Sequence, residues 1–166
     1  MKYTLLVLII IVNTISVKSQ NFVKNNEEVV FSFLTTKNKK LVIAKDKDYK
    51  YLVYRYGKNT TVEFQYPKTL TENSWNNFYY SSYFRGGGTA NEGLELNYLF
   101  FTNGVYKYVI YQEYDSETND TYCGIKVINT KTNKTNDIKG QSSTIKGSLD
   151  LSDYEDINHS DELFEE

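Results

Sequence analysis

The sequence predicts an all-β fold: a single-domain antiparallel meander of about eight strands that closes as a small barrel or sandwich. Three observations predict it. Apolar and polar residues alternate along many short segments, whereas the spacing of an amphipathic helix is nearly absent. Tyrosine, phenylalanine, valine and isoleucine crowd these segments, as they do in β-strands. The connections are short and rich in turn residues, so they allow antiparallel neighbours but no parallel crossovers.

The strands are predicted from alternation and turn signals. The clearest alternation is at 61–66, where Val62, Phe64 and Tyr66 point to one side and polar residues to the other. Asn103-Gly104 is the strongest hairpin signal, because both residues tolerate a positive φ. The remaining predicted strands lie between similar turn signals and cover residues 29–33, 41–45, 49–56, 78–84, 94–101, 105–114 and 121–129.

Residues 1–19 are predicted to be a secretory signal peptide. Met1-Lys2 gives a positive start, the run LLVLIIIV covers 5–12, and Ser19 ends a stretch suited to cleavage. The run is shorter than the roughly 20 apolar residues of a membrane-spanning helix. We therefore expect a secreted or periplasmic β-domain over 20–149, with no membrane span after the signal is removed.

Residues 150–166 form an acidic tail without lysine or arginine. A segment of this composition is typically solvated and disordered, and we expect that here. The alternative is a tail that folds back over a basic binding face, because the rest of the chain has a small excess of lysine and arginine. That excess is too small for a nucleic-acid partner, which calls for a strongly basic surface.

The sequence has few of the residues that common catalytic mechanisms require. His159 is the single histidine and Cys123 the single cysteine. A nucleophile–histidine pair or a histidine–cysteine zinc site needs more of these residues, held together by packing. Cys123, flanked by strand residues, is interpreted as a small buried apolar residue. The sequence predicts no catalytic residues, no metal site and no cofactor.

A cluster of glycines marks the candidate binding site. The stretch YFRGGGTANEG covers 83–93, but Leu94-Glu95 follows where a phosphate-binding loop requires Lys-Ser/Thr. Two interpretations stay open: a bend that glycine at positive φ permits, or a nest of glycine amides that binds an anion. The predicted partner-binding residues of this loop are Arg85, Gly86, Gly87, Gly88, Asn91 and Glu92. In the first interpretation Arg85 is tied to Glu92.

Trp75 completes the candidate site. It follows the single proline, in a polar connection. One interpretation is an exposed anchor for a partner, as tryptophan often is at interfaces. The other is an indole that covers an open end of the barrel, in keeping with the usual burial of tryptophan.

These observations predict an exported, non-catalytic binding module for a protein or glycan partner, and an inhibitor is one example of such a module. The alternative is a glycan-active hydrolase with paired carboxylates. Glu92 with Glu95, or Glu113 with Asp115, are its candidates, although their spacing does not distinguish them from solvated acids.

Overall fold

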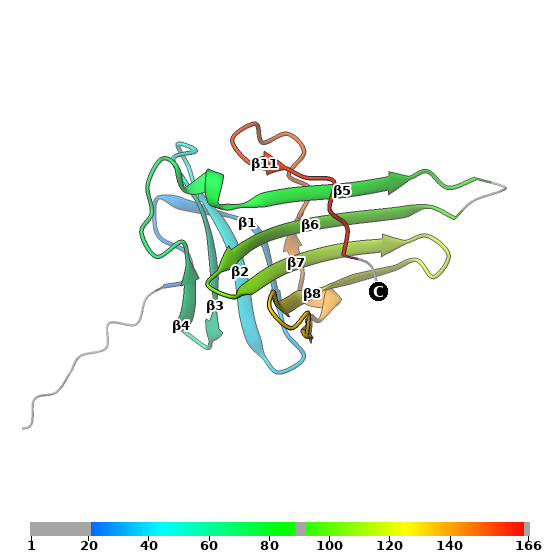
Figure 1. Ribbon diagram of the computed structural model, residues 1–166, viewed down its shortest axis with the longest axis horizontal. Coiled ribbons are helices and arrows are strands. Elements are labelled where there is room, and N and C mark those ends of the chain that lie inside the picture. Colours follow the sequence, from blue (N-terminus) through cyan, green and yellow to red (C-terminus); the bar gives the residue numbers. More distant parts are fainter. Residues whose placement is uncertain (1–20, 89–91, 165–166) are drawn as a thin grey trace, which may run out of the picture.

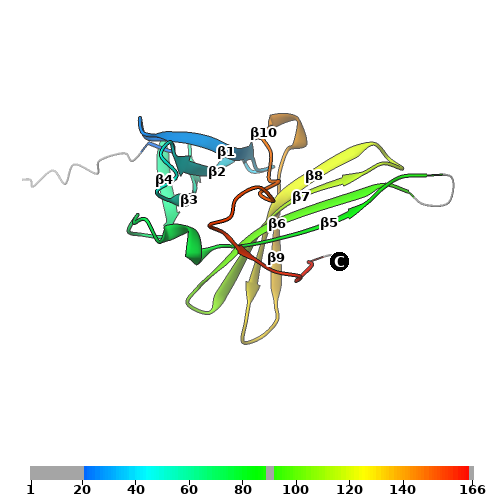
Figure 2. The same ribbon diagram turned by 90° about the horizontal axis from the view of Figure 1, so that it is seen from above.

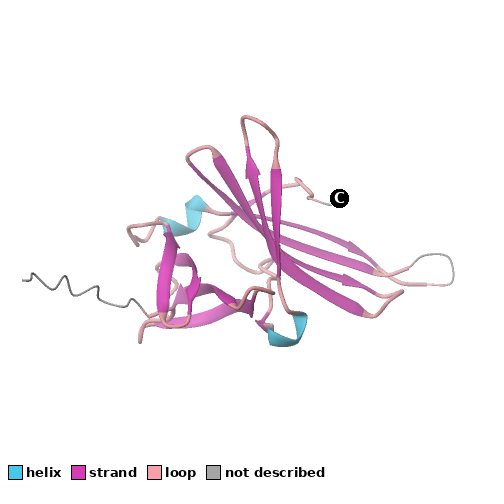
Figure 3. Ribbon diagram, turned by 90° about the horizontal axis from the view of Figure 1, so that it is seen from below, coloured by secondary structure: helices cyan, strands magenta, loops and turns pink. Residues whose placement is uncertain are grey.

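The computed structural model describes residues 21–88 and 92–164, and within these ranges the protein is all-β, as predicted (Figure 1). The strands form two separate sheets that do not close into a barrel, an arrangement compatible with the sandwich alternative (Figure 3). Two short 3₁₀ helices, η1 (Ser74–Asn77) and η2 (Ser142–Thr144), lie in the connections. No helix of the described residues is long and apolar enough to cross a membrane.

The first sheet has five strands in the order β10-β1-β2-β3-β4. Its members are β1 (Glu27–Leu34), β2 (Lys39–Asp46), β3 (Leu52–Lys58), β4 (Thr61–Tyr66) and β10 (Lys146–Gly147). The second sheet has six strands in the order β11-β5-β6-β7-β8-β9. Its members are β5 (Tyr79–Arg85), β6 (Leu94–Asn103), β7 (Tyr106–Asp115), β8 (Asp120–Asn129), β9 (Thr135–Lys139) and β11 (Asn158–His159).

The predicted hairpin joins β6 to β7, one residue later than the Asn-Gly pair suggested. Asn103 pairs with Tyr106, so the two loop residues are Gly104 and Val105. Gly104 has φ of 64°, as the first loop position of a type II′ turn requires. The chain departs from the expected meander at β11, which pairs in parallel with β5, whereas the other described strand pairs are antiparallel.

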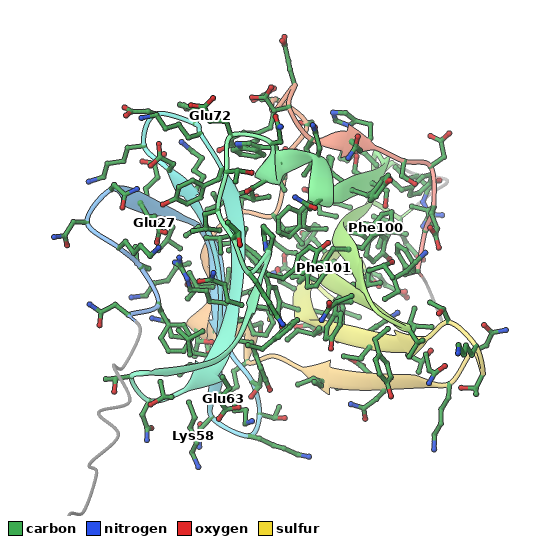
Figure 4. All side chains as sticks on the ribbon, turned by 60° about the vertical axis from the view of Figure 1, so that its left-hand side comes forward. Glu27, Lys58, Glu63, Glu72, Phe100 and Phe101 are labelled. Carbon is green, nitrogen blue, oxygen red and sulfur yellow. The ribbon has the colours of Figure 1, made fainter. Side chains whose placement is uncertain are left out.

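The main core lies between the two sheets and is rich in stacked aromatic rings. Phe101 on β6 points into this space, and Phe100 points to the opposite face of the second sheet (Figure 4). The rings of Tyr66 and Phe101 stack with centroids 4.1 Å apart, which joins the two sheets. Apolar residues alternate with the pleat, so one face of each strand supplies this core.

The outer face of each sheet carries a second apolar cluster. On the first sheet, Phe22 from the N-terminal segment packs with Val42 and Val53. Beside it, Arg55 and Glu27 form a fully buried ion pair, with Nη1–Oε2 at 2.6 Å and Nη2–Oε1 at 2.8 Å. Arg55 Nη1 also donates to the Phe22 carbonyl at 2.9 Å, so the pair fastens the N-terminal segment to the sheet.

The acidic tail differs from the expected disordered segment. Leu151 and Ile157 are buried in the core between the sheets, and Phe164 is buried on the outer face of the second sheet. Lys107 Nζ pairs with Glu162 Oε1 at 2.6 Å, and Lys126 Nζ donates to the Phe164 carbonyl. The composition argument fails because a few apolar residues, spaced among the acids, are enough to make an extended segment part of the core.

Candidate functional site

The far ends of β5–β8 extend beyond the first sheet (Figure 2). We call their last three cross-strand rows the distal blade; it comprises residues 83–85, 94–96, 113–115 and 120–122. The register is continuous across all four strands, so each row places its side chains on one face of the sheet. The blade therefore has two faces, and the first sheet packs on neither at this end.

Exposed aromatic rings occupy both faces of the distal blade. Phe84 and Tyr114 lie in the row that contains Glu95, on the face that continues the core. Tyr83 and Tyr122 lie in the next row, on the outer face. Phe84 is 76% exposed and the three tyrosines are 36% to 48% exposed. Large exposed aromatic residues gathered in one place are typical of interaction surfaces rather than of ordinary solvent-facing strands.

The charge of this end of the molecule is negative, although residues 20–149 together have a small excess of lysine and arginine. Arg85 is the single basic residue of the described blade and its connecting loops. The acids there are Glu92, Glu95, Glu113, Asp115, Glu117 and Asp120. Tyr98 Oη donates to Glu113 Oε1 at 3.0 Å, which fixes one of these carboxylates on the outer face. The surface therefore favours a partner that carries positive charge.

A polar hollow of about 340 Å³ lies beside Phe84 on the inner face. Tyr80 Oη donates to Asn97 Oδ1 at 2.6 Å, and Asn97 Nδ2 donates to Glu95 Oε1 at 2.9 Å. Tyr80 Oη also lies 3.2 Å from Asp150 Oδ1, so the tail closes one side of the hollow. This network holds the polar floor rigid beneath the exposed ring.

A second groove, of about 350 Å³, lies beside the part of β8 that β9 does not pair with, and side chains from both faces of β8 line it. Tyr111 Oη reaches across Gly124 to donate to Asp137 Oδ1 at 3.1 Å. Burial, together with the Asp137 charge, raises the pKa of Tyr111. Burial raises the pKa of Cys123, which also lines the groove, to about 12. A thiol with this pKa is protonated at neutral pH and is a poor nucleophile.

The glycine loop lies at the tip of the distal blade, but neither predicted mechanism fits it. None of Gly86, Gly87 and Gly88 has a positive φ; within the described chain that conformation occurs at other glycines. The expected bend at positive φ is therefore wrong, and an anion nest, which needs alternating backbone handedness, has no support. Arg85 Nε donates to the Glu92 carbonyl at 2.9 Å, so the predicted tie exists through the backbone instead of the carboxylate. Asn91 lies outside the described residues.

Trp75 is not part of this surface. Its side chain is 2% exposed, Nε1 donates to the Tyr49 carbonyl at 2.8 Å, and its ring stacks on Tyr154 with centroids 5.3 Å apart. The interpretation as an exposed anchor is wrong, because the indole is enclosed between the connection after β2 and the tail. A buried tryptophan whose N–H has a partner stabilises the fold.

The structure thus brings Arg85, Gly86–Gly88 and Glu92 together at one tip and separates Trp75 from them. Sequence reasoning missed the aromatic residues Tyr83, Phe84, Tyr114 and Tyr122, which read as ordinary strand residues. Tyr83 and Phe84 are consecutive in β5 and therefore lie on opposite faces of the sheet. Nothing in their pattern indicates that the opposing sheet ends before it reaches them.

Hydrolytic chemistry gains no support from the arrangement. Of the two predicted pairs, Glu113 and Asp115 are two residues apart on β7 and share the outer face, whereas Glu92 lies in the loop before β6 and Glu95 lies within β6. Asp115 Oδ1 accepts a hydrogen bond from the Glu117 amide at 2.8 Å, as a turn-forming residue does. A general acid needs a raised pKa, whereas the carboxyls with shifted values among the described residues, Glu27 and Asp150 for example, are lowered. No group of three or more described His, Cys, Asp or Glu residues is placed to hold a metal ion.

Comparison with known proteins adds no relative. No family model matches the chain, and no curated protein or solved structure matches it.

Proposed function

We propose that the protein is an exported, non-catalytic binding module that docks on a protein partner through the distal blade. One observation carries this proposal: four exposed aromatic residues gather on the part of the second sheet that extends beyond the first sheet (Figure 2). Aromatic side chains supply large contact areas at low entropic cost, and they dominate the energetic centres of protein interfaces.

Export is the second part of the proposal. It rests on the apolar run near the N-terminus and its positive start, which lie outside the described residues. Mass spectrometry of protein recovered from its host is expected to find an N-terminus at or within a few residues of Gln20. Recovery of the mature chain with Met1 intact contradicts export.

The negative charge of the blade favours a protein over a neutral glycan. Six carboxylates with one arginine attract a basic polypeptide, whereas an uncharged sugar gains nothing from them. The aromatic rings serve either partner, since sugars also stack on them. The test must therefore offer both classes.

The experiment compares three immobilised forms of the chain from residue 20 onward: the natural sequence, Phe84→Ala with Tyr114→Ala, and Tyr106→Ala. Tyr106 is a matched control, because it is 43% exposed and lies at the opposite end of β7 from Tyr114. Each form is exposed to extracellular protein from the host and to a glycan array. We expect specific proteins to bind the natural sequence and the control but not the double variant. Equal capture by all three forms contradicts the proposal, as does blade-dependent binding of glycans alone.

A further inference from the structure

The outer edge of β5 is paired along only part of its length. β11 pairs with Tyr79 and Tyr80, and the Ser160 amide donates to the Tyr80 carbonyl at 2.9 Å. The tail then leaves the edge and crosses onto the outer face, where the Glu162 carbonyl accepts a hydrogen bond from a serine hydroxyl of β5 at 2.6 Å. Within the described ranges, no backbone group pairs with the edge at 82–85.

The geometry of β5 shows which groups this free edge presents. The carbonyls of Phe78 and Tyr80 accept hydrogen bonds from the tail, so the backbone groups of these residues point away from β6. Backbone groups alternate sides along a strand, and the register of β5 with β6 is continuous up to Arg85. The N–H and C=O groups of Ser82 and Phe84 therefore point outward, in line with those that the tail already uses.

This edge lacks the usual protection against strand pairing. Natural edge strands carry proline, lysine, a bulge or an inward-pointing charge, since an open edge otherwise recruits another chain. Ser82, Tyr83 and Phe84 offer none of these, and the pairing with β6 has no register shift. The charged Arg85, at the end of the edge, donates from Nε to the Glu92 carbonyl. Tyr83 and Phe84 instead place exposed rings on alternate faces, where they contact the side chains of an added strand.

We propose, on the basis of the proposed function, that the partner binds by strand addition: an extended basic segment of another protein pairs with β5 at 82–85. Tyr83 and Phe84 then clasp it from the two faces, and the blade carboxylates attract its lysine or arginine residues. A second copy of this chain fits less well. Its own blade is acidic and repels the first, and an edge of four residues buries too little area for a stable dimer.

The test begins with a phage-displayed library of random 12-residue peptides, selected on the chain from residue 20 onward. We expect enriched peptides to alternate apolar residues and to contain lysine or arginine. On addition of a synthetic enriched peptide, exchange of the Ser82 and Phe84 amide hydrogens is expected to slow at least tenfold. The Tyr83 amide, which faces β6, is the internal control and is expected to change little.

Two variants separate the contribution of the Ser82 backbone N–H to peptide binding from that of its side chain. Ser82→Pro removes an outward N–H without removing a bond to β6, and we expect it to weaken peptide binding at least tenfold. Ser82→Ala keeps the N–H and is expected to bind within about twofold of the natural sequence. The amide-exchange measurement needs no substitution, so the test holds even where the proline variant folds poorly.

The outcomes distinguish this inference from the proposed function. If peptides bind, and Phe84→Ala weakens them, but the Ser82 and Phe84 amides exchange as before, strand addition is wrong and the blade remains a protein-binding surface. If the selection yields no peptide whose binding depends on Phe84, strand addition is also wrong. If only glycans bind in a Phe84-dependent manner, both proposals fail.

Discussion

Removal of residues 150–166 is expected to unfold the protein or bring it close to unfolding. The deletion removes Leu151, Ile157 and Phe164, which are 0%, 3% and 8% exposed. Each buried side chain of this kind contributes about 1.5–3 kcal/mol, so the loss is roughly 5–9 kcal/mol. The whole free energy of unfolding of a domain is about 5–15 kcal/mol, so little or none remains.

Urea denaturation followed by circular dichroism and tryptophan fluorescence measures this loss. Trp75 stacks on Tyr154, a residue of the deleted segment, so the fluorescence also reports the lost contact. Leu151→Ala is a less disruptive variant, and we expect it to lower the free energy of unfolding by about 2–5 kcal/mol. A truncated chain that unfolds at the urea midpoint of the full chain refutes this account of the tail, because a solvated tail predicts that result.

Four further predictions concern single residues. Gly88→Ala is expected to shift stability by less than about 0.5 kcal/mol, because an added Cβ meets nothing within 4 Å and φ is not positive. Gly124→Ala is expected to lower the thermal midpoint clearly, since its Cβ would lie 2.3 Å from a tyrosine hydroxyl oxygen. Arg55→Ala is expected to cost about 3–5 kcal/mol by urea denaturation, because it leaves a buried carboxylate unpaired. Cys123 is expected to resist thiol reagents in the folded protein and to react on unfolding, as the raised pKa and burial imply.

The buried ion pair also predicts a pH dependence. Burial raises the pKa of Glu27, but hydrogen bonds from Arg55, from the Lys24 amide and from Tyr51, with the Arg55 charge, outweigh it and lower the pKa below 4.5 in the folded state. A lowered folded pKa contributes stability above pH of about 4.5, and this contribution is lost as pH falls towards the folded value. Urea midpoints measured between pH 7 and pH 3 are expected to show the loss. Glu27→Gln is expected to remove this part of the pH dependence; an unchanged profile contradicts the role of Glu27.

The sequence predicts the positions of most strands, but not which strands pair with one another. Alternation and turn residues place the strands from β1 to β8, because both signals are local and each turn needs particular residues such as Gly104. β9, with the sequence TNDIK, and the two-residue strands β10 and β11 lack that signal. They form because long-range pairing supplies partners for their backbone groups, which no local pattern records.

The sequence places the glycine loop at an exposed tip, but the conformation that it predicts for the glycines does not occur there. The glycine loop lies at the same end of the molecule as the distal blade, and loops held by a rigid scaffold often carry function. Its glycines do not use the conformation that only glycine adopts freely. Phe84 and Tyr114 could not be predicted as surface residues from the sequence, because their exposure depends on where the first sheet ends. Trp75 was also placed wrongly in the site. Its ring stacks on Tyr154, which belongs to the tail that the sequence predicts to be disordered.

Photo-crosslinking in the protein's own host tests the central claim most directly. p-Benzoylphenylalanine in place of Phe84 puts the reactive group on the distal blade, and the same replacement at Tyr106 puts it at the far end of β7 as a control. The account predicts a discrete covalent adduct with another protein from position 84, and none with that protein from position 106. No adduct from position 84, or the same adduct from both positions, contradicts the claim that the distal blade is the binding surface.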